Sequence, residues 1–321
     1  RVRSSAASDV YKRQEQIKRG LIMANLKELF DSNVNIMEYF RKNNNTDYNS
    51  SYAILASYDQ QAGSYIKMLE SDEIRNNYHV NSVQTPMTHK KFVDMYCSQI
   101  AKRLEPLDFE TVLDAGIGEA TILLNIAKHL NNKQLKFYGF DISASRIKVA
   151  KEYCKTHSFS PNLFVCDMKH IPLQDNSIDL VYTNHAVEPN TNKEYEIISE
   201  LFRVCKKYLV MCEPSYELGN PETKANIEKH KYIKNLKQAV DELDGKLLKY
   251  ELLPVGTFAN QPAIYIIENN HTRDITNNKP GFACPVCRKK LLQKNGENFC
   301  ENCGLVYPIT VSYTHLTLPT I

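Results

Sequence analysis

Short apolar runs alternate with amphipathic stretches in the middle of the chain. Three stretches, 119–131, 144–157 and 192–206, repeat apolar residues at the three- and four-residue spacing of a helix with one buried face. The apolar runs between and around them have the length of strands and cover residues 111–115, 135–140, 162–166, 177–184 and 207–213. Strands that alternate with helices predict an α/β fold, in which helices cover both faces of a mostly parallel sheet.

The regions on either side of this pattern differ from it. Residues 23–105 are polar and helical in character, and within them 86–104 places apolar residues at steps of four. A charged helical segment at 221–243 is followed by two apolar runs, 247–253 and 263–268, which predict two more strands. We therefore expect a helical cap before the sheet and additional strands after it.

At both ends of the chain we expect sequence that does not belong to the fold. The peptides SSAASDVYKRQ (4–14) and VSYTHLTLPT (311–320) can be encoded by one oligonucleotide read in opposite orientations, which resembles a sequencing-library adapter. We expect the natural protein to start at Met23 and to continue past residue 310. The expected organisation is 1–22 and 311–321 outside the fold, 23–105 as a helical cap, 106–270 as a doubly wound α/β domain, and 271–310 as a linker with a small cysteine module.

The net charge changes sign when these ends are set aside. The whole chain carries 40 Lys and Arg residues against 37 Asp and Glu residues, a formal charge of +3. Residues 1–22 hold six of the basic and two of the acidic residues, and 311–321 hold none, so 23–310 carry 34 basic and 35 acidic residues. The basic character therefore gives no support for nucleic-acid binding.

Apolar runs and scattered cysteines indicate the compartment. The sequence has no run of 18 or more apolar residues, so no membrane span is predicted. Five cysteines lie scattered through the main body, as expected for reduced core residues of a cytoplasmic protein. They are Cys97, Cys154, Cys166, Cys205 and Cys212.

The stretch VLDAGIGEATILL (112–124) runs from a strand through two glycines into a helix-like segment. Such a turn brings backbone N–H groups close to a ligand, most often a phosphate. The dinucleotide fingerprint G-x-G-x-x-G would require a third glycine at position 121, where Thr121 stands. Asp114, two residues before Gly116, would also repel a pyrophosphate and suit a cation. The turn therefore favours a ligand with an ammonium group, a carboxylate and a nucleoside over NAD.

Residues 111–213 resemble the class I S-adenosylmethionine (SAM)-dependent methyltransferases. The resemblance rests on VLDAGIGEA, on FDIS and CDM at the ends of the second and third strands, and on the SIDLVYTN strand. It implies a seven-stranded, doubly wound, Rossmann-like sheet whose last strand is antiparallel, with ligands at the carboxyl ends of the strands. The third glycine of the family's G-x-G-x-G turn is Ala120 here, and its methyl group is small enough for cofactor binding to survive.

The resemblance also implies the SAM contacts. Gly116 and Gly118 would bring the backbone against the methionine part, with Asp114 facing its ammonium group. Asp141 would accept hydrogen bonds from both ribose hydroxyls, and Asp167 would bind the adenine amino group. For either of the last two, an alternative role is that of a helix N-cap. The full expected set is Asp114, Ala115, Gly116, Gly118, Asp141, Ile142, Asp167, Met168, Asn184, Tyr58 and Tyr65.

Three further segments resemble a subgroup of bacterial methyltransferases found with surface-polysaccharide and sugar-modification enzymes. They are YDQQAGSY (58–65), NHAVEPN (184–190) and EPSYEL (213–218). In related small-molecule enzymes a tyrosine-bearing N-terminal helix closes over the cofactor, which makes Tyr58 and Tyr65 lid candidates. The alternative is that these tyrosines pack the N-terminal helices on the sheet.

The C-terminal module predicts a metal site. Cys284, Cys287, Cys300 and Cys303 form two C-x2-C pairs separated by twelve residues. Each pair places two thiolates on one tight turn, and a hairpin that joins the pairs gives a closed, four-sulfur structural zinc site of a zinc ribbon. Two disulfides are the alternative, which a reducing compartment disfavours, and a redox C-x-x-C lacks its βαβ context here.

Polar residues after the fourth and fifth strands are the catalytic candidates. Methyl transfer depends mainly on positioning, with a base if the acceptor carries a proton. His185 is a candidate base, since histidine titrates near neutrality, and its alternative role is to line the site wall. Glu188 and Glu213 could orient a sugar hydroxyl, and Tyr216 lies near the same rim. The sequence predicts SAM-dependent methyl transfer to a small metabolite or glycan precursor.

Two other functions stay open at this point. An rRNA or tRNA methyltransferase would use the zinc ribbon to contact RNA, but phosphate neutralisation calls for clustered Lys and Arg. The Thr-Asn-His-Ala segment (183–186) also stands where nucleobase amino-methylating enzymes have an N/D-P-P-Y turn. A non-enzymatic scaffold with a degenerate pocket is the other possibility, and the intact Asp114, Gly116, Gly118 and Asp141 count against it.

Overall fold

The computed structural model describes residues 25–130, 134–270, 279–294, 296–308 and 314–315. These residues fall into two units, one ending at Gln61 and the other beginning at Ala62. The first unit contains α2 (Ile36–Asn44) and α3 (Ser51–Gln60), which begin at side-chain caps from Asn35 and Ser50. Its small apolar core includes Leu26, Ile36 and Ala56.

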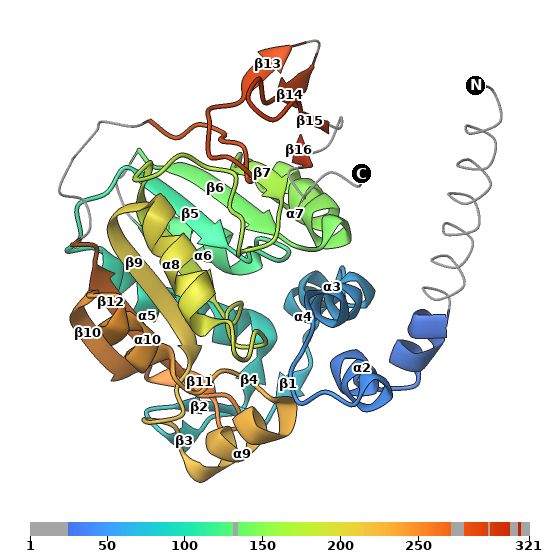
Figure 1. Cartoon of the computed structure of the whole chain (residues 1–321). Helices are drawn as coiled ribbons and strands as arrows, with labels where there is room; N and C mark the ends of the chain where they lie inside the picture. The colour runs from blue at the N-terminus through green and yellow to red at the C-terminus, as the bar shows by residue number, and fades with distance from the viewer. Residues whose placement is uncertain (1–24, 131–133, 271–278, 295, 309–313, 316–321) are drawn as a thin grey trace. The chain divides into compact units, whose positions relative to one another are not determined.

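The second unit is built on one sheet of eight strands (Figure 1). In spatial order they are β10 (Lys246–Leu252), β12 (Pro262–Glu268), β9 (Cys205–Pro214), β8 (Ile178–Asn184), β5 (Thr111–Ala115), β6 (Lys136–Asp141), β7 (Asn162–Val165) and β16 (Thr314–His315). All neighbours run parallel except β12, which is antiparallel to both β9 and β10. The predicted fold class, a doubly wound and mostly parallel Rossmann-like sheet, is confirmed.

The central strands form where the sequence has short runs of residues that are buried on both faces of the sheet. Every residue of β5 is buried, as are six of the seven residues of β8, which is expected where helices cover both sides of a parallel sheet. The apolar runs of the sequence therefore gave strand positions to within two residues at each end. The edge strand β10 has no buried residue and carries three exposed ones, as fits a strand with a single neighbour.

Two layers of helices cover the sheet. One face packs against α5 (His89–Leu104), α6 (Thr121–His129) and α7 (Ala144–Thr156). The other face packs against α8 (Glu194–Val204) and α10 (Leu236–Glu242). The expected helical segment at 221–243 is divided, because α9 (Pro221–His230) ends at Lys231 in a left-handed conformation.

The cysteine module completes the cover of the second face. The connection from β7 to β8, residues 166–177, contains no helix, unlike the other crossovers of this sheet. The module docks there: the Ala283 amide donates to the Pro172 carbonyl at 3.0 Å, and the Gln174 amide to the Gly281 carbonyl at 3.1 Å. Buried Cys284, Leu291, Cys300 and Tyr307 join the core of this face. The strands of the module are β13 (Leu292–Lys294), β14 (Glu297–Phe299) and β15 (Val306–Pro308).

The region expected to be a helical cap, residues 23–105, also contains strands. After α4 (Ser64–Glu70), β1 (Ile74–Arg75) pairs with β4 (Met87–Thr88). Between them, β2 (Tyr78–Val80) and β3 (Val83–Gln84) form a second small sheet with β11 (Val255–Thr257). Sequence reasoning missed these strands, because they are two or three residues long and β2 finds its partner far along the chain.

The expectations about the two ends lie mostly outside the described residues. None of residues 1–22 is described, and of 311–321 only Thr314 and His315 are, as a short parallel pairing with Phe164 and Val165 of β7. Among the described helices, none combines the length and apolarity needed to cross a bilayer.

Candidate active site

The glycine turn after β5 is held in left-handed backbone conformations. Gly116 and Gly118 have φ values of +91° and +57°. A Cβ on Gly116 would lie 2.3 Å from Cβ of Ala186 and 3.6 Å from Cε of Met168, so no other residue fits there. Ala120 keeps the left-handed conformation of the glycine it replaces, with φ +61°, at a cost of about 1–2 kcal/mol.

Two carboxylates flank this turn. Asp114 is 2% exposed, and its Oδ1 has no hydrogen-bond partner among the residues described. Burial, and then the nearby carboxylates of Asp141 and Glu213, raise the pKa of Asp114. A buried acceptor without a partner is costly, so this position suits a ligand that brings a cation or a hydrogen-bond donor.

Asp141 ends β6 and is tied to the same turn. Its Oδ2 accepts from the Gly118 amide at 3.0 Å, and its Oδ1 accepts from the Ser143 amide at 2.8 Å. Ser143 itself caps α7 by accepting from the Arg146 amide, so the helix N-cap is not Asp141. Asp141 is 4% exposed and lies 3.9 Å from the Arg146 guanidinium.

The other expected SAM contacts differ in their surroundings. Ala115 is fully buried at the end of β5, and Ile142 follows Asp141 half-buried. Asp167 accepts from the Lys169 amide at 3.0 Å and pairs with its ammonium group at 3.3 Å. The ring of Tyr65 lies 5.0 Å from the Arg146 guanidinium, which joins it to the Asp141 side of the turn. Tyr58 lies on α3, in the unit that ends at Gln61.

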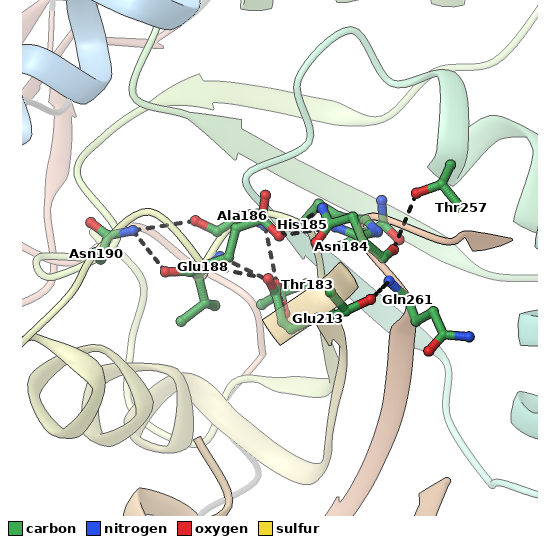
Figure 2. A network of polar contacts seen from close by, with 12 residues as sticks. Thr183, Asn184, His185, Ala186, Glu188, Asn190, Glu213, Thr257 and Gln261 are labelled. Atoms are coloured by element: carbon green, nitrogen blue, oxygen red, sulfur yellow. Dashed lines mark hydrogen bonds and ion pairs between the residues drawn. The ribbon is translucent and has the colours of Figure 1, made fainter. Parts of the chain in front are cut away.

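The segment after β8 carries the candidate base (Figure 2). Nδ1 of His185 lies 3.0 Å from Oε2 of Glu188, and Nδ2 of Asn260 lies 3.4 Å from the same oxygen. Because the carboxylate can only accept, Nδ1 carries the proton and Nε2 is the basic nitrogen. The backbone of His185 is left-handed, with φ +50°, and its side chain is 28% exposed. Asn184 accepts a 2.7 Å hydrogen bond from Tyr96 on α5.

The neighbouring carboxylates control the protonation of His185. Burial alone would lower the pKa of His185, but the charge and hydrogen bond of Glu188, together with Glu213, raise it. The imidazole is therefore a stronger base than an ordinary histidine, and its conjugate acid is held by a carboxylate.

Glu213 holds the segment after β8 in place through hydrogen bonds to its backbone. It is fully buried on β9, and its carboxylate accepts from the Thr183 hydroxyl at 2.8 Å and from the backbone amides of Ala186, Val187 and Glu188 at 3.1–3.2 Å. Burial, and then Glu188, raise the pKa of Glu213 to about 7. Both oxygens of Glu213 are bound to the protein and none of its surface is exposed, so Glu213 holds the segment that carries His185.

The structure brings together Asn184, His185, Glu188 and Glu213, as expected. Tyr216 has a different environment, because its hydroxyl donates to Glu228 at 3.0 Å and Lys224 and Lys234 lie over its ring. Sequence reasoning missed Asn260, which reaches His185 from 75 residues away. Asn260 belongs to no recognisable motif, so no sequence signal could have found it.

The four cysteines of the C-terminal module form one cluster. Their sulfur atoms all lie within 4.8 Å of one another, and the Sγ atoms of Cys287 and Cys300 are 3.4 Å apart. All nine cysteines of the chain are free thiols, so the disulfide alternative is not the one observed. The Lys289 amide, and then the Cys303 thiol, lower the pKa of Cys287 to about 6, whereas Cys287 raises the pKa of Cys303 to about 12. Four thiols this close ionise together only around a cation, so the donor set suits a metal ion.

Arg288 links the cysteine module to the catalytic unit, by which we mean the eight-stranded sheet and the helices that cover it. It follows Cys287 in a left-handed conformation, with φ +63°, and donates to Oε1 of Glu200 at 2.8 Å. Glu200 also accepts from Arg203 at 2.8 and 3.0 Å and from the Ile171 amide at 2.7 Å. Burial opposes ionisation, but the hydrogen bonds of Arg203 and Arg288 lower the pKa of Glu200.

Fold and site together define the class of protein, a doubly wound α/β domain with a ligand-binding turn at the carboxyl end of β5. Residues 108–259 match the model of a family described as a methyltransferase domain. The match covers slightly less than half of the chain and supports the expectation of a methyltransferase domain over these residues. No curated protein matches the sequence significantly.

Several solved structures share the fold. The cyclase SpnF is 14% identical with a TM-score of 0.54, and the alignment covers 69% of this chain and 97% of SpnF. Magnesium protoporphyrin IX methyltransferase from Synechocystis PCC 6803, with bound S-adenosylhomocysteine (SAH), is 12% identical with a TM-score of 0.51, covering 69% and 100%. Geranyl diphosphate methyltransferase, in complex with GPP and sinefungin, is 11% identical with a TM-score of 0.50, covering 67% and 98%. At these identities the likeness concerns the fold alone.

The His185–Glu188 pair predicts a measurable pKa change. Glu188→Gln should lower the pKa of His185, because burial then acts without the opposing carboxylate. NMR titration of the imidazole measures this, with Glu228→Gln on α9 as a control that leaves the pair intact. Since the folded pKa of His185 is raised, the stability from the pair is complete below the unfolded value of about 6.5 and is lost as pH rises through the folded value. An unchanged or higher His185 pKa in Glu188→Gln would contradict this account.

Proposed function

We propose that the protein binds SAM at the turn after β5 and transfers its methyl group to a small hydroxylated metabolite or glycan precursor. The observation that carries the proposal is the pair of buried carboxylates, Asp114 and Asp141, on either side of a left-handed glycine turn. Asp114 has an unmatched acceptor for the ammonium group of SAM, and Asp141 has the position expected to bind the ribose. Met168, beside Gly116, would pack against the adenine.

The fold alone does not decide the reaction, because a cyclase shares it. The residues after β8 support methyl transfer to oxygen. When the acceptor oxygen attacks the sulfonium methyl, the C–S bond breaks and its electron pair stays on sulfur, which leaves SAH. His185 would take the hydroxyl proton on Nε2, and Glu188 would stabilise the imidazolium. Glu213 and Asn260 would hold this pair in place.

The environment of the cysteine module favours this function over an RNA methyltransferase. Arg288, one of its basic side chains, is bound to buried Glu200, and the module shares the core of the catalytic unit. Carboxylates rather than Lys and Arg surround His185, which suits a hydroxyl donor and repels phosphate. RNA contact by the module remains the second candidate function.

We also propose that the cysteine cluster binds one zinc ion as a structural site. Four thiol ligands, two of them fully buried, suit zinc and leave no open position for catalysis. The ion would hold the two C-x2-C turns together and so keep Arg288 in place against Glu200.

The SAM assignment predicts binding that depends on Asp141. Isothermal titration calorimetry should show SAM binding by the wild type, and Asp141→Ala should weaken it by about 1.5–3 kcal/mol, since it removes hydrogen bonds to a charged group. Asp141→Asn, which keeps the shape and one acceptor, serves if the alanine variant does not fold. Tight NADH binding with no SAM binding would refute the assignment.

The metal assignment predicts about one zinc per chain in protein purified without added metal. Elemental analysis should show that Cys300→Ala loses the metal, whereas Cys154→Ala, which removes a buried thiol outside the cluster, keeps it. A zinc content near zero, with the four thiols oxidised to disulfides, would overturn this proposal.

The acceptor class predicts where a methyl label goes. With labelled SAM, label should appear in a polar-metabolite or sugar-nucleotide extract and not in bulk RNA. His185→Asn should lower the rate of transfer more than it lowers SAM affinity, because the imidazole acts on the acceptor. Label in RNA, with rates that fall steeply as salt rises, would favour the RNA methyltransferase instead.

A further inference from the structure

Glu119, inside the glycine turn, binds the backbone at the start of α4. Its Oε1 accepts from the amide of Gly63 at 2.9 Å and of Tyr65 at 3.4 Å, and its Oε2 accepts from the amide of Ile66 at 3.0 Å. Glu119 is 1% exposed. The cap residue of α4 is Gly63, which offers no side chain, so a carboxylate more than 50 residues away satisfies the first amides of this helix.

The side chain of Tyr65 on α4 also connects this helix to the same turn. Tyr65 lies over the Arg146 guanidinium at 5.0 Å, and Arg146 lies 3.9 Å from Asp141. The guanidinium also packs on Gly118, where an added Cβ would lie only 2.6 Å from its NH2 group. The path from Glu119 through α4, Tyr65 and Arg146 to Asp141 therefore closes on the residues that flank Gly118. Both ends of this path lie in the proposed SAM site.

We propose that Glu119 is a positioning residue, a latch that holds α4 against the turn of the proposed SAM site and thereby sets how slowly SAM leaves. The inference rests on the proposed SAM binding and deepens it. A buried carboxylate that accepts hydrogen bonds from three backbone amides holds a helix end firmly, because water cannot easily replace those amides as donors. Any movement of α4 away from the turn requires these hydrogen bonds to break first. Glu119 acts through α4 and does not itself touch the methyl group.

The first measurement tests directly whether Glu119 holds α4 in place. Glu119→Gln keeps the size of the side chain but loses its charge, and one of its terminal atoms becomes a donor that faces backbone N–H groups. Hydrogen exchange of residues 62–70 in the full chain should become faster in Glu119→Gln. The matched control is Asp179→Asn, since buried Asp179 also accepts three hydrogen bonds, from Glu110 and Thr111, but at the opposite end of β5.

The second readout separates a latch from a purely structural role. The dissociation rate of tritiated SAM, chased with unlabelled SAM, should rise about tenfold or more in Glu119→Gln, as expected for the loss of one charged hydrogen bond. Asp179→Asn should lower the melting temperature without changing that rate. If Glu119→Gln does not fold, Tyr65→Ala tests the same path and should also speed release.

The outcomes are distinguishable. If the wild type binds no SAM, the proposed function is wrong and the latch with it. If the wild type binds SAM and Glu119→Gln releases it at an unchanged rate, only the latch is wrong. A rate that rises equally in Asp179→Asn and Glu119→Gln would mean that general destabilisation, and not the hold on α4, sets the release of SAM.

Discussion

The site depends on how this protein satisfies four carboxylates that it buries at the carboxyl edge of one sheet. Glu213 and Glu119 are satisfied by backbone amides, and each fixes a segment: the one after β8 and the start of α4. Asp141 is partly satisfied by the turn itself. Asp114 keeps an unmatched oxygen, and burial raises its pKa. The unmatched oxygen of Asp114, among so many buried acids, suits a ligand that carries a cation.

At the same edge, one residue has a side chain that can act as a base, and its neighbours hold that residue in position. His185 has a half-buried imidazole whose tautomer is fixed by Glu188. Asn260 donates to Glu188, and Glu213 holds the backbone of the residues that follow His185. A base on a segment this strongly held can be positioned closely, which is the main contribution that an enzyme makes to an in-line displacement. Structures with the same fold include both a methyltransferase and a cyclase, so the sheet by itself does not decide the reaction.

The cysteine module has an architectural role that its sequence motif does not suggest. The sheet has an uncovered stretch where the β7–β8 crossover lacks a helix, and the module packs its own buried residues there. Phe282 meets Phe164 of β7 edge-on at 5.6 Å, and Arg288 joins Glu200 of α8. A metal that orders two tight turns would in this way support the catalytic unit, because the turns carry the groups that dock on it.

The sequence by itself determined the parts of the structure that have a local cause. Apolar runs located the strands of the sheet because burial on both faces requires them, and the glycine turn followed from residues that tolerate left-handed backbone. The C-x2-C spacing gave the sulfur cluster, because two residues between cysteines place both thiols on one turn. Asp141 was a candidate because the resemblance places it at the end of the second strand, and His185 because it follows the fourth.

The tertiary structure alone decided which distant groups meet. The small sheet of β2, β3 and β11 joins segments about 175 residues apart in strands too short to show a pattern. Asn260 reaches His185, Glu119 reaches the start of α4, and Arg288 reaches Glu200 only because the chain folds that way. Such contacts leave no periodicity or spacing in the sequence, since each depends on the register and packing of elements that are separately encoded.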